Sequence, residues 1–122
     1  MLRSMMQVYI KDSEAALELY RRAFDAEVCC AYPHEDRKGY MHAELNIYGQ
    51  ILALSEAEEE PLSGNTMQFC LHMGDGAEDE VRRIWKILSN GDEDAVPPAP
   101  CEYSTCQFTL VDRFGVSWCV FV

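Results

Sequence analysis

The sequence predicts an α+β fold made of two tandem βαβββ modules, with module one at about residues 1–60 and module two at about 66–122. Three observations support this prediction. The same order of strand-like and helix-like runs occurs in both halves, each half contains one amphipathic helix, and hairpin glycines recur at Gly49 and Gly115, 66 residues apart. A chain of 122 residues is long enough for one domain of ordinary size.

The first half begins with a strand and a helix. Residues 5–10 alternate in polarity, and Asp12 or Ser13 can then cap a helix that extends to about Ala26. Three strand-like runs follow, the last two joined by a tight turn at Gly49: residues 27–33, 40–48 and 50–55.

The second half repeats this order. Residues 66–73 alternate like a strand, and residues 77–89 have the apolar spacing of a helix. A proline-rich link at 96–100 follows, and the strand expected next is only weakly indicated. Two further strands surround the turn Asp112-Arg-Phe-Gly115, at residues 105–111 and 116–121.

The composition excludes several kinds of partner. The net charge is −11, from 21 acidic and 10 basic residues, so a nucleic acid backbone would be repelled. No apolar run approaches the ~20 residues of a membrane helix, and the first residues do not resemble a secretory signal. The 6 cysteines form no C-x-x-C motif, so we expect free thiols in the reducing cytoplasm.

Three segments resemble the vicinal oxygen chelate superfamily, which includes glyoxalase I, extradiol dioxygenases and bleomycin-resistance proteins. They are YIKDSEAALELYRRAF (Tyr9–Phe24), HAELNIYGQILALSE (His42–Glu56) and LVDRFGVSWCVFV (Leu110–Val122). The details look most like the PhnB-like branch, and the resemblance covers essentially the whole chain. It implies two modules whose mixed sheets curl around a shared cavity, with one helix on the outer face of each module. It also implies a homodimer.

Strand parity predicts which side chains face that cavity. Apolar residues that pack on a helix leave the alternate residues on the opposite face of each strand. On this basis we predict that a small organic molecule contacts nine residues: Gln7, Tyr9, His42, Glu44, Gln68, Cys70, His72, Phe108 and Cys119.

The resemblance also identifies where metal-dependent relatives hold their ion. Carried onto this chain, the four ligand positions are Met5, Ala53, Gln68 and Cys119. Only Gln68 is a ligand type that the superfamily uses, and Met5 and Ala53 cannot bind a hard divalent ion. We therefore expect no metal and no other cofactor, and a protein that binds a small organic molecule.

An enzyme is the alternative interpretation. A lyase, isomerase or dioxygenase of the superfamily could use Glu44 as a general base, with its pKa raised by burial, and His42 or His72 as its partner. The same His/His/Glu set could hold a relocated zinc or iron ion. The favoured reading of His42 and Glu44 is a polar pocket lining in which the two hydrogen-bond each other, a ligand or water.

Overall fold

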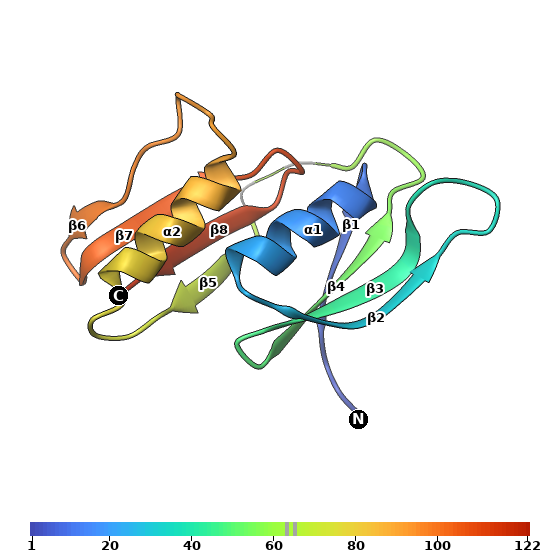
Figure 1. The fold of residues 1–122 in the computed structure, drawn as a ribbon, viewed down its shortest axis with the longest axis horizontal. Helices are drawn as coiled ribbons and strands as arrows, with labels where there is room; N and C mark the ends of the chain where they lie inside the picture. Colours follow the sequence, from blue (N-terminus) through green and yellow to red (C-terminus); the bar gives the residue numbers. More distant parts are fainter. Residues whose placement is uncertain (63, 65) are drawn as a thin grey trace. The chain divides into compact units, whose positions relative to one another are not determined.

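Each half of the chain forms one four-stranded mixed sheet with one helix on it (Figure 1). The structure, a computed structural model, describes residues 1–62, 64 and 66–122. These residues divide into two compact units, Met1–Leu62 (unit 1) and Ser63–Val122 (unit 2). Among the described residues, no helix is both long enough and apolar enough to cross a bilayer.

Unit 1 has the predicted βαβββ order. Its sheet runs β1-β4-β3-β2, in which β1 pairs with β4 in parallel and the other pairs are antiparallel. The helix packs against the two central strands, β3 and β4. The elements are β1 (Met6–Ile10), α1 (Ser13–Ala23), β2 (Glu27–Pro33), β3 (Tyr40–Ile47) and β4 (Gln50–Glu56).

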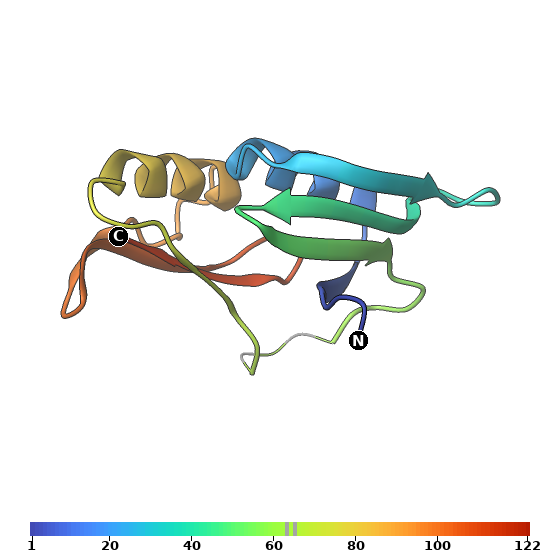
Figure 2. The same ribbon diagram turned by 90° about the horizontal axis from the view of Figure 1, so that it is seen from below.

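Unit 2 repeats the same topology, with the order β5-β8-β7-β6 and a parallel β5–β8 pair. Figure 2 shows α2 covering one face of β7 and β8. The elements are β5 (Phe69–His72), α2 (Glu78–Ser89), β6 (Ala99–Cys101), β7 (Ser104–Val111) and β8 (Ser117–Phe121). The prediction of two βαβββ modules is therefore confirmed.

The structure of β6 explains why the sequence pattern of one strand in the second module was weak. It spans only Ala99–Cys101, all three residues are exposed, and it contains Pro100. A proline lacks the amide hydrogen that a central strand needs, but an edge strand tolerates it. The short edge therefore leaves almost no alternating pattern to detect.

A single carboxylate ties together the start of α1 and the sheet of unit 1. The Glu56 carboxylate accepts hydrogen bonds from the backbone N–H of Asp12 at 3.0 Å and from the backbone N–H and hydroxyl of Ser13, both at 2.8 Å. The Ser13 hydroxyl in turn accepts the N–H of Tyr40 at 2.9 Å. The helix ends at Ala23, before the predicted Ala26, because Asp25 adopts the left-handed region with φ 46°.

A carboxylate also organises the β7–β8 hairpin of unit 2. Asp112 is buried, and its side chain accepts hydrogen bonds from the N–H groups of Phe114 and Val116 at 2.9 and 3.0 Å. Its second oxygen accepts the indole N–H of the fully buried Trp118 at 2.9 Å. A buried indole N–H needs such a partner, so the turn and the core depend on the same side chain.

The β3–β4 turn fixes the faces of the strands that carry the site. Tyr48 and Gly49 have φ of 51° and 91°, as a two-residue hairpin turn with two left-handed residues requires. Ile47 therefore pairs with Gln50, and Leu45 with Leu52. Because Leu45 and Leu52 are fully buried, the residues that alternate with them, such as Glu44 and Ala53, lie on the opposite face of the sheet, away from α1.

Candidate functional site

The face of the unit 1 sheet that α1 leaves uncovered, called here its open face, carries a row of side chains across all four strands. The register pairs Gln7 with Ala53, Ala53 with Glu44, and Glu44 with Cys30. Paired residues in adjacent strands project on the same side of a sheet. The parity prediction that Gln7 and Glu44 share a face is therefore confirmed.

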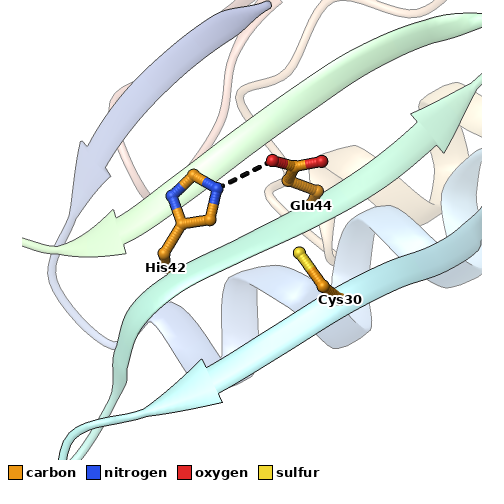
Figure 3. A group of neighbouring side chains, drawn as sticks. All are labelled: Cys30, His42 and Glu44. Atoms are coloured by element: carbon orange, nitrogen blue, oxygen red, sulfur yellow. Dashed lines mark hydrogen bonds and ion pairs between the residues drawn. The ribbon is translucent and has the colours of Figure 1, made fainter.

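Glu44 is the centre of this face. Its side chain is only 6% exposed, and each of its oxygens accepts a hydrogen bond of 2.8 Å from the Arg3 guanidinium. Nε2 of His42 lies 2.9 Å from the same carboxylate (Figure 3). The predicted hydrogen bond between His42 and Glu44 is present, and a bidentate arginine pair, the strong form of a charged hydrogen bond, accompanies it.

This environment keeps Glu44 ionised. The hydrogen bonds from Arg3 and then from His42 lower the pKa of Glu44 from 4.5 to about 2, although burial alone would raise it. The expectation of a raised pKa for Glu44 was therefore wrong: burial does act in that direction, but the hydrogen bonds from Arg3 and His42 outweigh it. A carboxylate with so low a pKa is a weak proton acceptor at neutral pH, which argues against a general base.

A thiol completes the group. One ligand atom from each of Cys30, His42 and Glu44 lies within 4.8 Å of the other two. Figure 3 shows the Cys30 sulfur on the side of β3 where the imidazole and carboxylate lie. Burial, and then the charge of Glu44, raises the pKa of the Cys30 thiol, so it is protonated at neutral pH.

Two further predicted residues flank this group on β1. The amide of Gln7 donates to the Ser55 hydroxyl at 3.0 Å and to the Val8 carbonyl at 3.3 Å. Tyr9 pairs with Ser55 in the parallel register, and its side chain is exposed. Both side chains therefore lie on the same open face as Glu44, with β4 between them and β3.

Unit 2 brings another subset of the predicted residues together. Cys70 pairs with Cys119, and His72 pairs with Phe121, so these four share the open face of the second sheet. The imidazole of His72 stacks on the Phe121 ring at 4.7 Å, and Tyr103 meets that ring edge-on at 5.4 Å. Burial, and then a hydrogen bond with Cys119, raises the pKa of the Cys70 thiol.

The predicted placement of Phe108 on the open face was wrong. Phe108 pairs with Val120, is 2% exposed, and lies on the same side of the sheet as the core residue Val120. Its neighbour Gln107 pairs with Phe121 and takes the predicted position, donating from its amide to the Cys119 sulfur at 3.6 Å. The alternation along β7 does carry the signal, because Thr105, Gln107 and Thr109 are polar and lie on the face opposite Phe108; the prediction set this alternation aside in placing an aromatic ring in the binding site.

The side chains at the four positions that the resemblance implied for a metal offer little to a hard divalent ion. Met5 offers a thioether and Ala53 offers no donor at all. The Gln68 amide is engaged as a donor to the Ser117 hydroxyl and the Trp118 carbonyl, at 3.2 and 3.4 Å. Cys119 is buried beside Gln107. The alternative set of His42, Glu44 and His72 draws on both units, so only its His42–Glu44 half is tested, and the rest stays a prediction.

Two residues of the site were missed from the sequence. Arg3 precedes the first strand, in a segment without periodicity, so no pattern connects it with Glu44, 41 residues later. Cys30 was recognised as part of a strand, but its partner depends on a bulge between Val28 and Cys30 in the β2–β3 register. Parity along β3 alone identifies Glu44; only the cross-strand register identifies its neighbours.

The fold and the site define a two-module protein with duplicated βαβββ sheets. Residues 4–120 match the model of the glyoxalase/bleomycin resistance protein/dioxygenase superfamily. The chain belongs to this superfamily, as the resemblance in the sequence implied. None of the curated proteins matches the chain.

Solved structures with the same fold span nearly the whole chain. Protein PA1353 from Pseudomonas aeruginosa has a TM-score of 0.82 at 20% identity, covering 99% of this chain and 97% of its own. A putative 3-demethylubiquinone-9 3-methyltransferase, the PhnB protein from Bacillus cereus, has a TM-score of 0.79 at 18% identity, covering 98% of both chains. The fosfomycin resistance protein FosX from Mesorhizobium loti has a TM-score of 0.70 at 16% identity, covering 98% of this chain and 89% of its own. Because the sequence identities are this low, these structural matches establish that the fold is shared and nothing further.

Proposed function

We propose that the chain is a PhnB-like member of the superfamily that binds a small organic molecule on the open faces of its sheets, with no metal at the superfamily's usual positions. The observation that carries this proposal is the ionised Glu44 carboxylate, buried on the open face of unit 1 and hydrogen-bonded by Arg3 and His42. A buried charge with fixed partners is what orients a ligand in a binding site.

The surroundings of Glu44 favour binding over catalysis. Tyr9 supplies exposed aromatic surface, Gln7 supplies an amide, and Ser55, which accepts a hydrogen bond from Gln7, supplies a hydroxyl. A few polar groups among apolar side chains are typical of small-molecule sites. Glu44 is already neutralised by Arg3, so it lacks the raised pKa that a general base would need. Arg3 and His42 offer N–H donors, which suit oxygen-bearing organic molecules.

The test is a screen of small oxygenated organic molecules by thermal denaturation, with the protein kept in a metal chelator. A ligand should raise Tm without any metal, and Tyr9→Ala and Gln7→Ala should reduce the rise. Glu18→Ala is the matched control, because Glu18 is an exposed residue of α1 and should leave the rise unchanged. A rise that appears only after Mn²⁺ or Fe²⁺ is restored would contradict binding without a metal.

The same preparation tests the oligomeric state. We propose a homodimer, supported by the superfamily resemblance. Light scattering should give twice the chain mass of 13.9 kDa. A value equal to one chain would contradict it.

A further inference from the structure

The group formed by Cys30, His42 and Glu44 contains three kinds of metal-ligating atom on two adjacent strands. Cys30 on β2 is the register partner of Glu44 on β3, and His42 lies two residues before Glu44 on the same side of β3. The sulfur, the imidazole nitrogen and a carboxylate oxygen lie within 4.8 Å of one another. None of the three lies at a metal position of the superfamily, which in this unit are Met5 and Ala53.

We propose that Cys30, His42 and Glu44 bind a thiophilic divalent cation such as Zn²⁺, and that Arg3 competes with this cation for Glu44. Thiolate, imidazole and carboxylate are the ligands of zinc in proteins. Three protein ligands leave the fourth tetrahedral position for water or for an organic molecule. Binding needs no rearrangement of the backbone, since the three residues lie on paired strands.

Charge balance explains the competition. Without the cation, Arg3 supplies the positive charge for the Glu44 carboxylate through both of its 2.8 Å hydrogen bonds. When a divalent cation binds, the Cys30 thiol releases its proton to solvent and becomes a thiolate. The thiolate and the carboxylate then balance the charge of the cation, and Arg3 has no anion left to pair with. The Arg3 side chain is 51% exposed, so it can turn into water at little cost.

The experiment titrates the reduced, full-length chain with Co²⁺, which reports a bound thiolate through charge-transfer absorption in the near ultraviolet. Zn²⁺ added afterwards should displace Co²⁺ and abolish the absorption. The matched pair of variants is Cys30→Ser and Cys29→Ser. Cys29 is adjacent, exposed and outside the group, and its thiol donates to the Glu27 carbonyl at 3.9 Å.

We expect one Co²⁺ per chain, with Cys29→Ser unchanged. Cys30→Ser should weaken binding by at least about tenfold, the loss that even an outer partner of a metal ligand causes. His42→Ala, at a half-buried position, should weaken it similarly, and circular dichroism checks that each variant is folded. Arg3→Ala should tighten binding by roughly tenfold, because the cation no longer displaces a charged pair.

The direction of the Arg3→Ala effect distinguishes this site from any other. Absorption that survives Cys30→Ser would assign the cation to other thiols and overturn the proposal. So would the absence of thiolate absorption in the reduced chain, or weaker binding in Arg3→Ala. Because the organic-ligand screen is done in a chelator, its outcome does not depend on this one.

Discussion

Unit 1 and unit 2 place different chemistry at matching positions of the same sheet. Across β1, β4 and β3, the row in unit 1 is Gln7, Ala53 and Glu44. Across β5, β8 and β7, the matching row in unit 2 is Cys70, Cys119 and Thr109. The backbone pairing is the same, but one row holds an ionised carboxylate and the other holds two thiols and a hydroxyl.

The difference shows that the duplicated framework does not determine where charge is buried. In unit 1 the buried carboxylate is on the open face, where Arg3 forms an ion pair with it and His42 hydrogen-bonds it. In unit 2 the buried carboxylate is Asp112, in the hairpin, where backbone amides and an indole satisfy it. The structural carboxylate of Asp112 accepts hydrogen bonds from neutral donors, whereas Glu44 at the candidate site depends on the half-exposed guanidinium of Arg3.

The largest expected effect is the loss of the structural carboxylate in unit 2. Asp112→Ala removes three acceptor contacts, among them the one to the indole N–H of the buried Trp118, so the free energy of unfolding should fall by about 3 kcal/mol. Urea denaturation followed by tryptophan emission measures this. Arg113→Ala, in the same turn but exposed, is the control and should change stability by less than about 0.5 kcal/mol. Equal losses in the two variants would mean that Asp112 has no special role.

Removing the Arg3 guanidinium, which pairs with Glu44 in unit 1, should have the next largest effect. Arg3→Ala removes both hydrogen bonds from the guanidinium to the buried Glu44 carboxylate, so the free energy of unfolding should fall measurably, by less than in Asp112→Ala. Chemical denaturation followed by circular dichroism measures it. Arg82→Ala removes the exposed ion pair with Asp79 in unit 2 and should cost close to nothing. A loss in Arg82→Ala as large as in Arg3→Ala would contradict the comparison.

Acid should weaken unit 1 before unit 2. The folded pKa of Glu44, about 2, lies below its ordinary value of 4.5, so its stabilisation is complete above pH 4.5 and is lost as pH falls toward 2. The equivalent residue of unit 2, Thr109, does not titrate. Hydrogen exchange of β3 should therefore rise on acidification before the emission of Trp85 and Trp118, both in unit 2, changes.

Glu44→Gln supplies the reference for this acid titration. The amide cannot lose a charge, so exchange of β3 should depend less on pH in this window than it does in the unaltered chain. If both chains lose protection in β3 over the same pH range, groups other than Glu44 are responsible.

The smallest effect should come from copying the carboxylate into unit 2. Thr109 is exposed, so Thr109→Glu should change stability by less than about 0.5 kcal/mol. Its carboxyl should titrate near the ordinary glutamate value of about 4.3, which NMR can measure. A strongly lowered pKa at residue 109 would mean that unit 2 also supplies a cation, and would remove the distinction between the units.

Much of the fold could be predicted from the sequence because it is encoded locally. Alternating strands, amphipathic helices and the glycine at position 49 each carry their own signal. Strand β6 had none, because three exposed edge residues with a proline need no pattern. The face of Phe108 was misassigned although β7 does alternate, with Thr105, Gln107 and Thr109 on the face opposite Phe108.

The candidate site was predictable only in part because it depends on register and on an irregular segment. Parity placed His42 and Glu44 on one face of β3, which is a property of one strand. The contacts of Glu44 with Arg3 and Cys30 require the three-dimensional pairing of β2, β3 and the residues before β1. Since Arg3 reverses the sign of the pKa shift, the chemistry of Glu44 could not be predicted without it.

The hydrogen bonds that join Glu56, Ser13 and Tyr40 in unit 1, called the Glu56 junction, have a consequence for the order of folding. These hydrogen bonds join residues 13, 40 and 56, so the complete set requires α1, β3 and β4 to be in place together. Contacts of such long sequence separation become favourable only after the chain entropy of closing both loops has been lost. The junction therefore belongs to the last steps of folding, and it should act mainly by slowing the opening of unit 1.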